Sequence, residues 1–394
     1  MNATAAPAPA PLLPGATIGV LGGGQLGRML AMVARRMGYR VCVLDPDPTG
    51  PTGQLADAVV QGALSDVGLA LELGARCQVA TLDTEHVPFA VLEALERCVP
   101  VRPGAQVLRT IQDRLVQKSF LDDQGVPQAR GAPVGNAAEL DAAVHAIGLP
   151  AILKVRRAGY DGKGQVRIEP GADPAAAWAR IGREPAVLEA LVPFDREVSV
   201  LLARGVGGEI AFYPIAENEH RRHILHTTCA PARISPAARA RAEALATQLA
   251  AALDHVGVMA VEMFVIGNGA EQLLVNEIAP RTHNSGHYTF GACATSQFEQ
   301  HIRAVCGLPL GDPSLLQPAV MLNLTGDLWR DGTPPWQHVF ALPNAHLHLY
   351  GKELAAPGRK MGHLLLLDDD LDRARASAED LLARLRGQGR ASSD

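Results

Sequence analysis

The chain has 394 residues, of which 47% are apolar and 20% charged, and its formal net charge is -5. This length predicts two or three domains, because one hydrophobic core stops growing at roughly 250–300 residues. The charge gives no sign of a nucleic-acid partner, and no apolar run approaches the roughly 18 residues of a transmembrane helix. Six dispersed cysteines without a Cys-x-x-Cys pair favour reduced, mostly buried thiols in the cytoplasm.

The N-terminal part is predicted to be doubly wound, since it alternates strands and helices in the way that builds parallel sheets. An Ala/Pro-rich segment, residues 1–14, is expected to be a disordered tail. The predicted elements after it are a strand at 16–21, a glycine-rich turn at 22–27, a helix at 28–37, strands at 40–45 and 79–82, and a helix at 87–97.

The glycine-rich turn has the spacing of a dinucleotide-binding fingerprint. Gly22, Gly24 and Gly27 allow a backbone to approach an anion, and Asp45 ends the following strand where a ribose-binding acid would lie. Three interpretations stay open at this point: a dinucleotide site, a phosphate site for another ligand, and a tight turn that binds nothing.

The pattern of predicted elements changes within a helix predicted over residues 107–124. From residue 114 to residue 307 the predicted strands lie close together, which indicates an α+β domain with an antiparallel sheet. Those strands are residues 151–155, 187–192, 197–203, 209–215 and 258–265, with a helix at 237–253. The last part has predicted strands at 319–324, 346–350 and 363–367, a helix at 371–385, and a polar tail at 388–394.

The most informative stretch is residues 276–287, which concentrates a carboxylate, an arginine and two imidazoles directly after an apolar run. Glu277 lies in this stretch, and Glu262 lies in an earlier apolar run, residues 258–265. The turn at 267–269 would join two strands and hold both carboxylates side by side. An isolated Glu is more often solvated, but both of these interrupt apolar strands. Paired carboxylates beside nucleotide phosphates predict a magnesium site.

A second glycine-rich segment, residues 157–165, is predicted to connect two strands as a hairpin. Its amides could close over phosphates, although a plain exposed hairpin is about equally common. It is not a P-loop, because no Gly-Lys-Ser/Thr follows its glycines. Lys154 ends the preceding apolar strand, which favours a positive charge aimed at a phosphate.

Two weaker features involve histidines and a basic turn. His220, His223 and His226 are spaced three apart, but no Cys or carboxylate completes a zinc pattern, so His220 is interpreted as a hydrogen-bonding residue near a nucleotide. A glycine-rich turn concentrates positive charge that a phosphorylated metabolite would need, on Lys352, Arg359 and Lys360.

Together these motifs resemble the ATP-grasp superfamily and, within it, the bacterial and fungal N5-carboxyaminoimidazole ribonucleotide synthetases of purine biosynthesis. The most specific parts of the resemblance are residues 24–30, 159–165, 276–287 and 358–363. It implies an N-terminal doubly wound, Rossmann-like domain (15–113), a central two-lobed ATP-grasp domain (114–307) and a small C-terminal β-rich domain (308–387).

The resemblance also implies site residues by position. The implied ATP contacts are Arg114, Lys154, Gly159, Tyr160, Asp161, Gly162, Lys163, Gly164, Gln165, Glu189, Ala190, Leu191, Val192, Glu197, His220, Asn276 and Glu277. The implied magnesium carboxylates are Glu262 and Glu277. The implied ribonucleotide contacts are Gln25, Leu26, Glu85, Tyr160, Asp161, Arg281, Lys352, Arg359 and Lys360. Catalytic positions facing bicarbonate, the amine or the transferred phosphoryl group would be Arg281, His283, Asn284, Lys154, Tyr160 and Asp161.

The implied activity is carboxylation of 5-aminoimidazole ribonucleotide with bicarbonate and ATP, with Mg²⁺, through carboxyphosphate. The resemblance suggests a cytoplasmic homodimer with no nucleic-acid or membrane partner. Another ATP-grasp ligase, a formate-dependent transformylase or a biotin-carboxylase-like enzyme would keep the central domain and change the acceptor. A nicotinamide-dependent dehydrogenase would rest only on the glycine-rich turn and Asp45, and would leave the other motifs unexplained.

Overall fold

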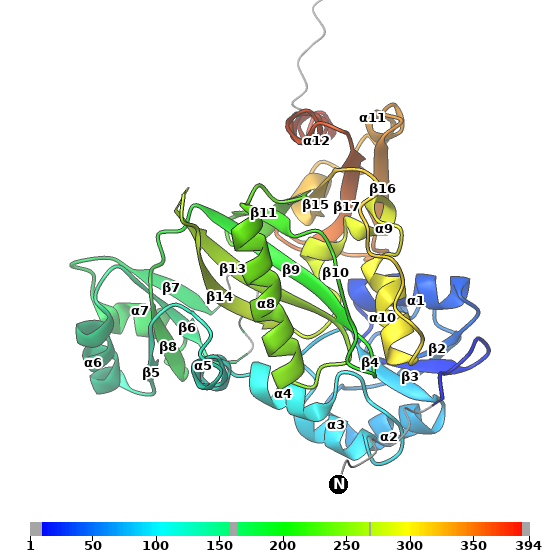
Figure 1. The fold of residues 1–394 in the computed structure, drawn as a ribbon, viewed down its shortest axis with the longest axis horizontal. Coiled ribbons are helices and arrows are strands. Elements are labelled where there is room, and N and C mark those ends of the chain that lie inside the picture. The colour runs from blue at the N-terminus through cyan, green and yellow to red at the C-terminus, as the bar shows by residue number, and fades with distance from the viewer. Residues whose placement is uncertain (1–9, 158, 160–163, 268, 388–394) are drawn as a thin grey trace, which may run out of the picture.

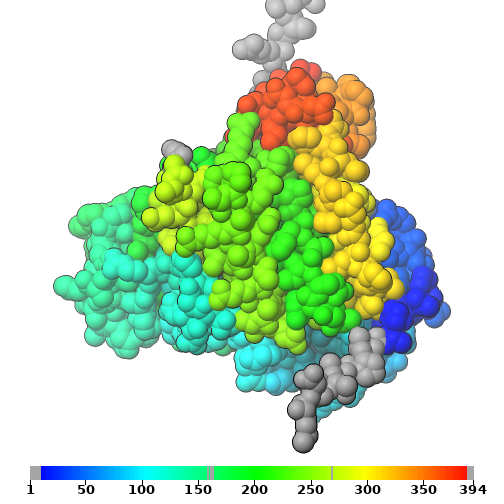
Figure 2. Space-filling view, viewed as in Figure 1, coloured from blue at the N-terminus to red at the C-terminus, as the bar shows by residue number. Residues whose placement is uncertain are grey.

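The computed structural model describes residues 10–157, 159, 164–267 and 269–387. Within these residues the strands form three sheets: a four-stranded parallel sheet, a four-stranded antiparallel sheet and a nine-stranded sheet (Figure 1). The antiparallel four-stranded lobe projects from one side of the molecule, and the C-terminal residues, in orange and red, lie at the top of this view (Figure 2).

The N-terminal domain is doubly wound, as predicted, with parallel strands in the order β3-β2-β1-β4. Apolar side chains on both faces of this sheet are buried, one set against α1 and the other against α2 and α3. Its elements are β1 (Thr17–Leu21), α1 (Gln25–Arg36), β2 (Arg40–Asp45), β3 (Ala58–Gln61), α2 (Val67–Ala75), β4 (Val79–Leu82), α3 (Phe89–Leu95) and α4 (Ala105–Ile111).

The small lobe of the central domain is an antiparallel sheet in the order β5-β8-β6-β7, covered by two helices that bury its apolar face. A further helix, α5, leads into it. The elements are α5 (Arg114–Asp123), β5 (Gly131–Val134), α6 (Ala137–Ile147), β6 (Ala151–Val155), β7 (Gln165–Ile168), α7 (Pro174–Arg180) and β8 (Ala186–Ala190).

The large sheet positions most of the site. Helix α8 buries its small side chains against β9 and β13, and α10 packs between β13 and α1 of the N-terminal domain. The elements are β9 (Arg196–Arg204), β10 (Ile210–Phe212), β11 (Ala216–Arg221), β12 (Ile224–Ala230), α8 (Pro236–Ala252), β13 (Gly257–Ile266), β14 (Gln272–Ala279), η1 (Asn284–Gly286), α9 (Thr289–Ala292) and α10 (Gln297–Val305).

The C-terminal strands extend this same sheet, because β15 pairs with β12 and gives the strand order β14-β13-β9-β11-β12-β15-β17-β16. Helix α12 packs its apolar face on β15 and β17. The elements are β15 (Ala319–Thr325), η2 (Gly326–Trp329), α11 (Gln337–Phe340), β16 (Ala345–Leu349), β17 (Lys360–Leu367) and α12 (Leu371–Leu385). None of the helices in the described residues is long and apolar enough to cross a membrane.

Three predicted elements differ from the structure. The single helix predicted over 107–124 is two helices, α4 and α5, because the Asp113 side chain accepts the Leu115 amide at 3.0 Å and starts a new helix there. The strand predicted over 209–215 is only the three-residue β10. Residues 10–14 of the predicted tail are held by the fold, since the Leu12 amide donates to the Cys306 carbonyl at 2.8 Å and the Tyr39 hydroxyl donates to the Leu12 carbonyl.

Candidate active site

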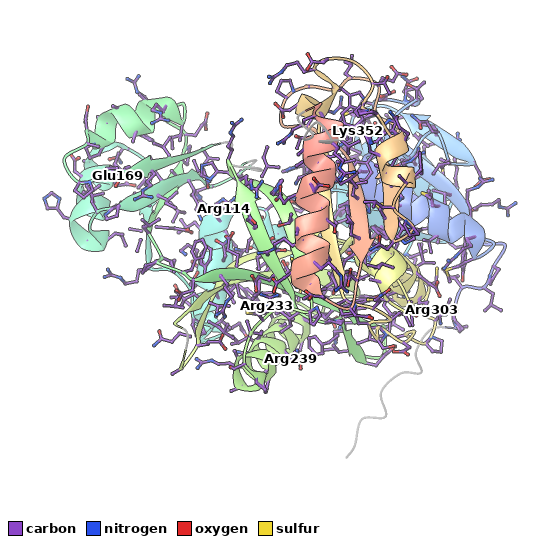
Figure 3. The ribbon with its side chains drawn as sticks, turned by 90° about the horizontal axis from the view of Figure 1, so that it is seen from above. Arg114, Glu169, Arg233, Arg239, Arg303 and Lys352 are labelled. Atoms are coloured by element: carbon purple, nitrogen blue, oxygen red, sulfur yellow. The ribbon has the colours of Figure 1, made fainter. Side chains whose placement is uncertain are left out.

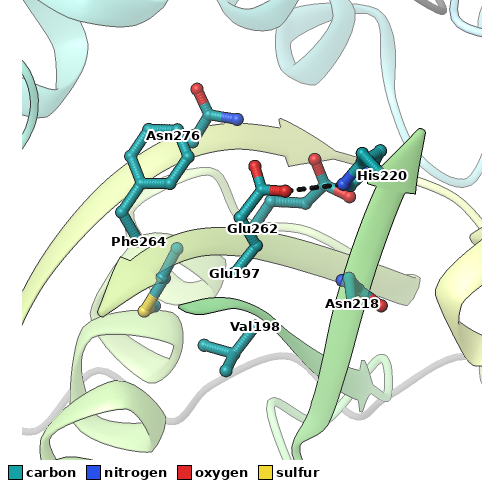
Figure 4. Close-up of a pocket in the computed structure, with 8 residues that line it drawn as sticks. Glu197, Val198, Asn218, His220, Glu262, Phe264 and Asn276 are labelled. Atoms are coloured by element: carbon teal, nitrogen blue, oxygen red, sulfur yellow. Dashed lines mark hydrogen bonds and ion pairs between the residues drawn. The ribbon is translucent and has the colours of Figure 1, made fainter. Parts of the chain in front are cut away.

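The two predicted metal carboxylates are direct cross-strand partners. Glu262 on β13 is paired in register with Glu277 on β14, so both side chains lie on the same face of the sheet. The register then shifts by one residue, which makes Asn276 the extra residue of a β-bulge. Bulges redirect side chains, and Asn276 lines the same small pocket as Glu262 (Figure 4).

This carboxylate pair is electrostatically unfavourable without a cation. Burial and then the neighbouring Glu277 carboxylate raise the pKa of Glu262 from 4.5 to about 7. No cluster of three or more His, Cys, Asp or Glu residues that would hold a metal by itself occurs among the described residues. Two carboxylates with the remaining positions open fit Mg²⁺, which usually takes one or two carboxylates together with substrate phosphates.

The predicted nucleotide contacts Glu197 and His220 lie beside this pair. Their side chains come from β9 and β11, and the Glu197 Oε2 to His220 Nδ1 distance is 2.6 Å. Burial alone would lower the pKa of His220, but Glu197 outweighs it and raises the value. The three histidines in this region do not converge: His223 contacts Gln165, and His226 bonds Glu379 on α12.

Arg281 and His283 lie on the same side of the site, after β14. Arg281 makes a two-point ion pair with Glu85, and although burial alone would raise the pKa of Glu85, the guanidinium lowers it to about 2. Burial followed by the charge of Arg281 lowers the pKa of His283 to about 3, so its ring is neutral. The Ser285 amide donates to Nδ1, which leaves the proton on Nε2, 3.6 Å from Glu262.

Asn284 has a buried partner. Its side-chain amide exchanges two hydrogen bonds with Asn323 on β15, at 3.0 and 2.8 Å. This pairing joins the polar stretch after β14 to the C-terminal domain. A role for Asn284 toward bicarbonate therefore stays a prediction, and it would require the amide to share or release these bonds.

Lys154 is ion-paired instead of free. Its Nζ lies 2.6 Å from Glu189, and Lys118 on α5 lies 3.2 Å from the other carboxylate oxygen of Glu189. Burial alone would raise the pKa of Glu189, but the two lysines lower it to about 2. Lys118 was not among the predicted site residues. It lies four residues after Arg114, and this spacing places Lys118 and Arg114 on the same face of α5.

Arg114 connects the two lobes (Figure 3). Its guanidinium lies 3.5 Å from Glu277 on the large sheet and donates to the Gly159 carbonyl at 3.3 Å. The base of the glycine-rich hairpin is anchored nearby, since Asp113 accepts from both Arg156 and Arg157. Gly164 and Gln165 end the hairpin at the start of β7, and four predicted residues lie outside the described part: Tyr160, Asp161, Gly162 and Lys163.

These side chains border an open cleft of ≈ 940 Å³ between the N-terminal domain and the two lobes. It brings together Glu85, Arg114, Gly159 and Glu277 from the predicted set with residues that sequence reasoning missed. The missed lining residues are His86, Pro88, Ile111, Gln112, Gln117, Arg156 and Arg157. Lys154 lines neither this cleft nor the smaller pocket beside Glu262.

Three further implied ATP contacts, residues 190–192, follow Glu189 at the end of β8. Ala190, Leu191 and Val192 are all half-buried. The Ala190 amide already donates to the Arg130 carbonyl and the Leu191 amide to Pro150. Nucleotide pairing through these two amides would therefore compete with bonds inside the lobe.

Two of the predicted ribonucleotide contacts, Gln25 and Lys352, meet where the N-terminal and C-terminal domains touch. Lys352 donates to the Gln25 side chain at 2.8 Å and to the Lys360 carbonyl at 2.6 Å. Arg359 donates to the Leu354 carbonyl at 2.9 Å. The Leu26 side chain is buried in the apolar core with α1, so any ligand contact from it would have to use its backbone.

Protein carboxylates occupy the amides of the glycine-rich turn. Gly23 donates to Asp45 at 2.6 Å, while Gly24 and Gly27 donate to Asp83 at 3.1 and 2.5 Å. A dinucleotide pyrophosphate would need these same amides, and two carboxylates would repel it. The turn therefore does not favour the nicotinamide-dependent alternative.

Comparison with known proteins decides the family. The ATP-grasp domain family matches residues 119–298, the ribonucleotide synthetase preATP-grasp domain family matches 15–112, and the phosphoribosylaminoimidazole carboxylase C-terminal domain family matches 319–377. The N5-carboxyaminoimidazole ribonucleotide synthase of Brucella melitensis is 46% identical over 355 residues, covering 90% of this chain and 96% of that protein. The chain belongs to the N5-carboxyaminoimidazole ribonucleotide synthase family. It is accordingly an ATP-grasp ligase that forms a C–N bond in purine biosynthesis.

Further relatives agree with this membership. The Bacillus subtilis synthase is 42% identical over 363 residues, covering 92% of this chain and 94% of that one. The Staphylococcus aureus enzyme complexed with ADP superposes with a TM-score of 0.89 at 38% identity, covering 94% of this chain and 98% of that one. The Aspergillus clavatus enzyme in complex with ADP and 5-aminoimidazole ribonucleotide gives 0.85 at 34% identity, with 94% and 98% covered.

These matches confirm the predicted three-domain architecture of the synthase family. The boundaries proposed at residues 113 and 307, and the individual roles of the site residues, stay predictions.

Proposed function

We propose that this chain binds ATP, bicarbonate and 5-aminoimidazole ribonucleotide, and transfers a carboxyl group to the amine of the ribonucleotide. The observation that carries the proposal is the cross-strand pair Glu262 and Glu277 beside a cleft that also contains Arg114. The Aspergillus clavatus relative, described in complex with ADP and the same ribonucleotide, supports the choice of substrates.

The first step is attack of a bicarbonate oxygen on the γ-phosphorus of ATP, which breaks the bond to the β-phosphate oxygen and releases ADP. The product is carboxyphosphate. Phosphoryl transfer of this kind needs alignment and charge neutralisation from the protein. We assign alignment to Arg281, held by Glu85, and to the neutral His283 ring with its proton on Nε2.

In the second step the 5-amino nitrogen forms a bond to the carboxyl carbon, directly or after carbon dioxide is released within the closed site. Phosphate leaves, and the amine loses a proton. The hairpin at 157–165, which includes Tyr160 and Asp161, is proposed to exclude water and orient the amine. Lys352, Arg359 and Lys360 would bind the substrate phosphate.

Magnesium is proposed as the metal, with Glu262 and Glu277 as its protein ligands. When bound there, the ion would neutralise phosphate charge and offset both the burial and the carboxylate repulsion that raise the pKa of Glu262. Lys154 would bind the nucleotide phosphates when it leaves Glu189, and Lys118 would keep Glu189 paired.

The remaining proposals concern state and location. The resemblance implies a homodimer, which light scattering of the purified protein would test. All six cysteines are free and five are buried, which supports the proposed location in a reducing compartment such as the cytoplasm.

The experiment that tests the function is phosphate release with ATP, Mg²⁺ and bicarbonate, with and without 5-aminoimidazole ribonucleotide, together with detection of the carboxylated product. We expect the product to form only when all four components are present. Phosphate release that never yields product, under any combination, would contradict the proposal.

A further inference from the structure

The segment between β16 and β17, residues 350–359, bears directly on the proposed phosphate site because it carries Lys352 and Arg359 and leads into Lys360. The N-terminal domain holds one side of it. Lys352 donates to the Gln25 side chain at 2.8 Å, and the Gln54 side chain donates to the Gly351 carbonyl at 2.8 Å.

A short turn of the C-terminal domain, η2, holds the other side. The Gly326 amide donates to the Arg359 carbonyl at 2.8 Å, and the Gly358 amide donates to Asp327 Oδ2 at 2.9 Å. A Cβ on Gly326 would lie 2.1 Å from the Ala356 carbonyl oxygen, so the two backbones are in direct contact. The turn and the segment are therefore joined by two hydrogen bonds and by close backbone packing.

Asp327 is well suited to be an anchor. Its hydrogen bond from the Gly358 amide is the main cause that lowers its pKa, so the carboxylate is ionised and accepts a charge-assisted bond. The Thr325 hydroxyl donates to the same oxygen at 3.2 Å and fixes its rotamer. Gly358 has φ +74, a conformation that glycine adopts freely and that leaves its amide pointing at the carboxylate.

The next residues of the segment also depend on this anchor. Thr325 pairs with Lys360, but Leu324 pairs with Gly362, so Met361 is the extra residue of a β-bulge. Bulges redirect side chains, and this one begins directly after Lys360. The anchor at Asp327 thus fixes the chain at the point from which Arg359 and Lys360 project.

We propose that Asp327 is a positioning residue for substrate binding: through the Gly358 amide and the segment 350–359, it holds Arg359 and Lys360 where they bind the phosphate of the ribonucleotide. This rests on the proposed role of Lys352, Arg359 and Lys360 as the phosphate site. Asp327 itself touches no substrate and acts as an acceptor for a backbone amide.

Steady-state kinetics of four variants test the proposal: Asp327→Ala, Asp327→Asn, Arg359→Ala and, as a matched control on an exposed acid of the same region, Asp331→Ala. We expect Asp327→Ala to raise the KM for the ribonucleotide about tenfold with the KM for ATP unchanged, which corresponds to the loss of about 1.4 kcal/mol. Asp327→Asn keeps an oxygen acceptor, so it should restore the KM to within about threefold of the parent protein. Asp331→Ala should behave like the parent.

The outcomes separate the two claims. If Arg359→Ala raises the ribonucleotide KM and Asp327→Ala does not, the positioning role is wrong and the phosphate site stands. If Arg359→Ala has no effect on that KM, the proposed phosphate site fails first. If Asp327→Ala raises the KM for the ribonucleotide and the KM for ATP equally and lowers the Tm, the role of Asp327 is merely structural. If Asp327→Asn is as impaired as Asp327→Ala, the role of Asp327 as a hydrogen-bond acceptor is wrong.

Discussion

At the scale of single residues, burial and then a neighbouring carboxylate make the ionisation of Glu262 costly. Glu262 and Glu277 face each other across two strands, and Glu262 is largely buried, so its ionisation is unfavourable until a cation is present. Energetic strain of this kind is typical of functional sites, where a group is held ready for a ligand. Removing the charge should therefore improve the stability of the unliganded protein while it harms the reaction.

The stability of Glu262→Gln tests this directly. The pKa of Glu262 in the folded protein is raised from 4.5 to about 7, so ionisation of this side chain destabilises the folded state. This destabilisation is small at pH values below the unfolded-state pKa and complete at pH values above the folded-state pKa. We expect the Gln variant to melt roughly 2–4 °C higher than the parent near pH 8, and the difference to shrink as the pH falls and to vanish below about pH 4. Thermal melts without metal or nucleotide, with exposed Glu184→Gln as control, provide the measurement. A lower Tm for the variant at alkaline pH would contradict the assignment.

The trio Lys118, Glu189 and Lys154 supports a second prediction. All three side chains are mostly buried, and removing Lys118 leaves Glu189 dependent on Lys154 alone. Since an unpaired buried charge is costly, Lys154 should then stay on Glu189 and bind ATP poorly. We expect Lys118→Met to raise the KM for ATP about tenfold, while Lys118→Arg stays near the parent value. Unchanged ATP kinetics in the Met variant would argue against any role for Lys154 in phosphate binding.

Some of these neighbours were predictable from the sequence. Acids that interrupt apolar strands on either side of a hairpin predict a facing pair, and Glu262 and Glu277 are such a pair. The sharing of Glu189 by Lys154 and Lys118 was not predictable, because Lys118 and Glu189 come from a helix and a strand far apart in the chain. Asp113 was missed for a related reason. It caps α5 and accepts from Arg156 and Arg157 because the structure breaks between α4 and α5, whereas the helical pattern of the sequence continues through this point.

At the scale of secondary structure, β-bulges shape the site. One bulge makes Asn276 line the pocket with Glu262, and another follows Lys360 at the start of β17. Periodicity predicted long elements such as α8, β13 and α12 closely, since their apolar pattern runs unbroken. It could not predict the bulges or the split between α4 and α5, which depend on individual hydrogen bonds.

Replacement of Lys352 should raise the KM of one substrate selectively. Lys352 joins Gln25 to the Lys360 carbonyl, so its loss removes a positive charge and a contact between domains. Lys352→Ala is expected to raise the KM for the ribonucleotide about tenfold and to change the KM for ATP much less, because the triphosphate site lies on other strands. Steady-state titration of each substrate, with Lys352→Arg as the charge-retaining control, measures this. Equal effects on both substrates would count against a substrate-phosphate role.

Across the whole molecule, a single sheet links the proposed metal site to the C-terminal domain. The order β14-β13-β9-β11-β12-β15-β17-β16 runs from Glu277 on β14 at one edge to β17 and β16, the two strands that flank residues 350–359. The N-terminal domain closes the cleft from the other side through Glu85 and its pair with Arg281. Sequence motifs predicted three domains, but the joining of the C-terminal strands to the large sheet of the central domain depends on the β12 and β15 pairing, which no local pattern reveals.

Membership of the synthase family predicts that the substrate activated by ATP is bicarbonate and not formate. Formate differs from bicarbonate by lacking the hydroxyl group, and an enzyme of the synthase family should not use it as a donor. We expect formate in place of bicarbonate to give no ribonucleotide-dependent ADP release above background. Turnover with formate comparable to that with bicarbonate would favour a formate-dependent transformylase.

The most direct test of the account is ADP release by Glu277→Gln at saturating Mg²⁺, ATP, bicarbonate and ribonucleotide. The substitution keeps the size of the side chain and removes one of the two charges proposed to hold the metal, so turnover should fall about a hundredfold or more while the Tm and circular dichroism remain those of a folded protein. A folded variant that retains substantial turnover would contradict the claim that Glu262 and Glu277 together bind magnesium for the reaction.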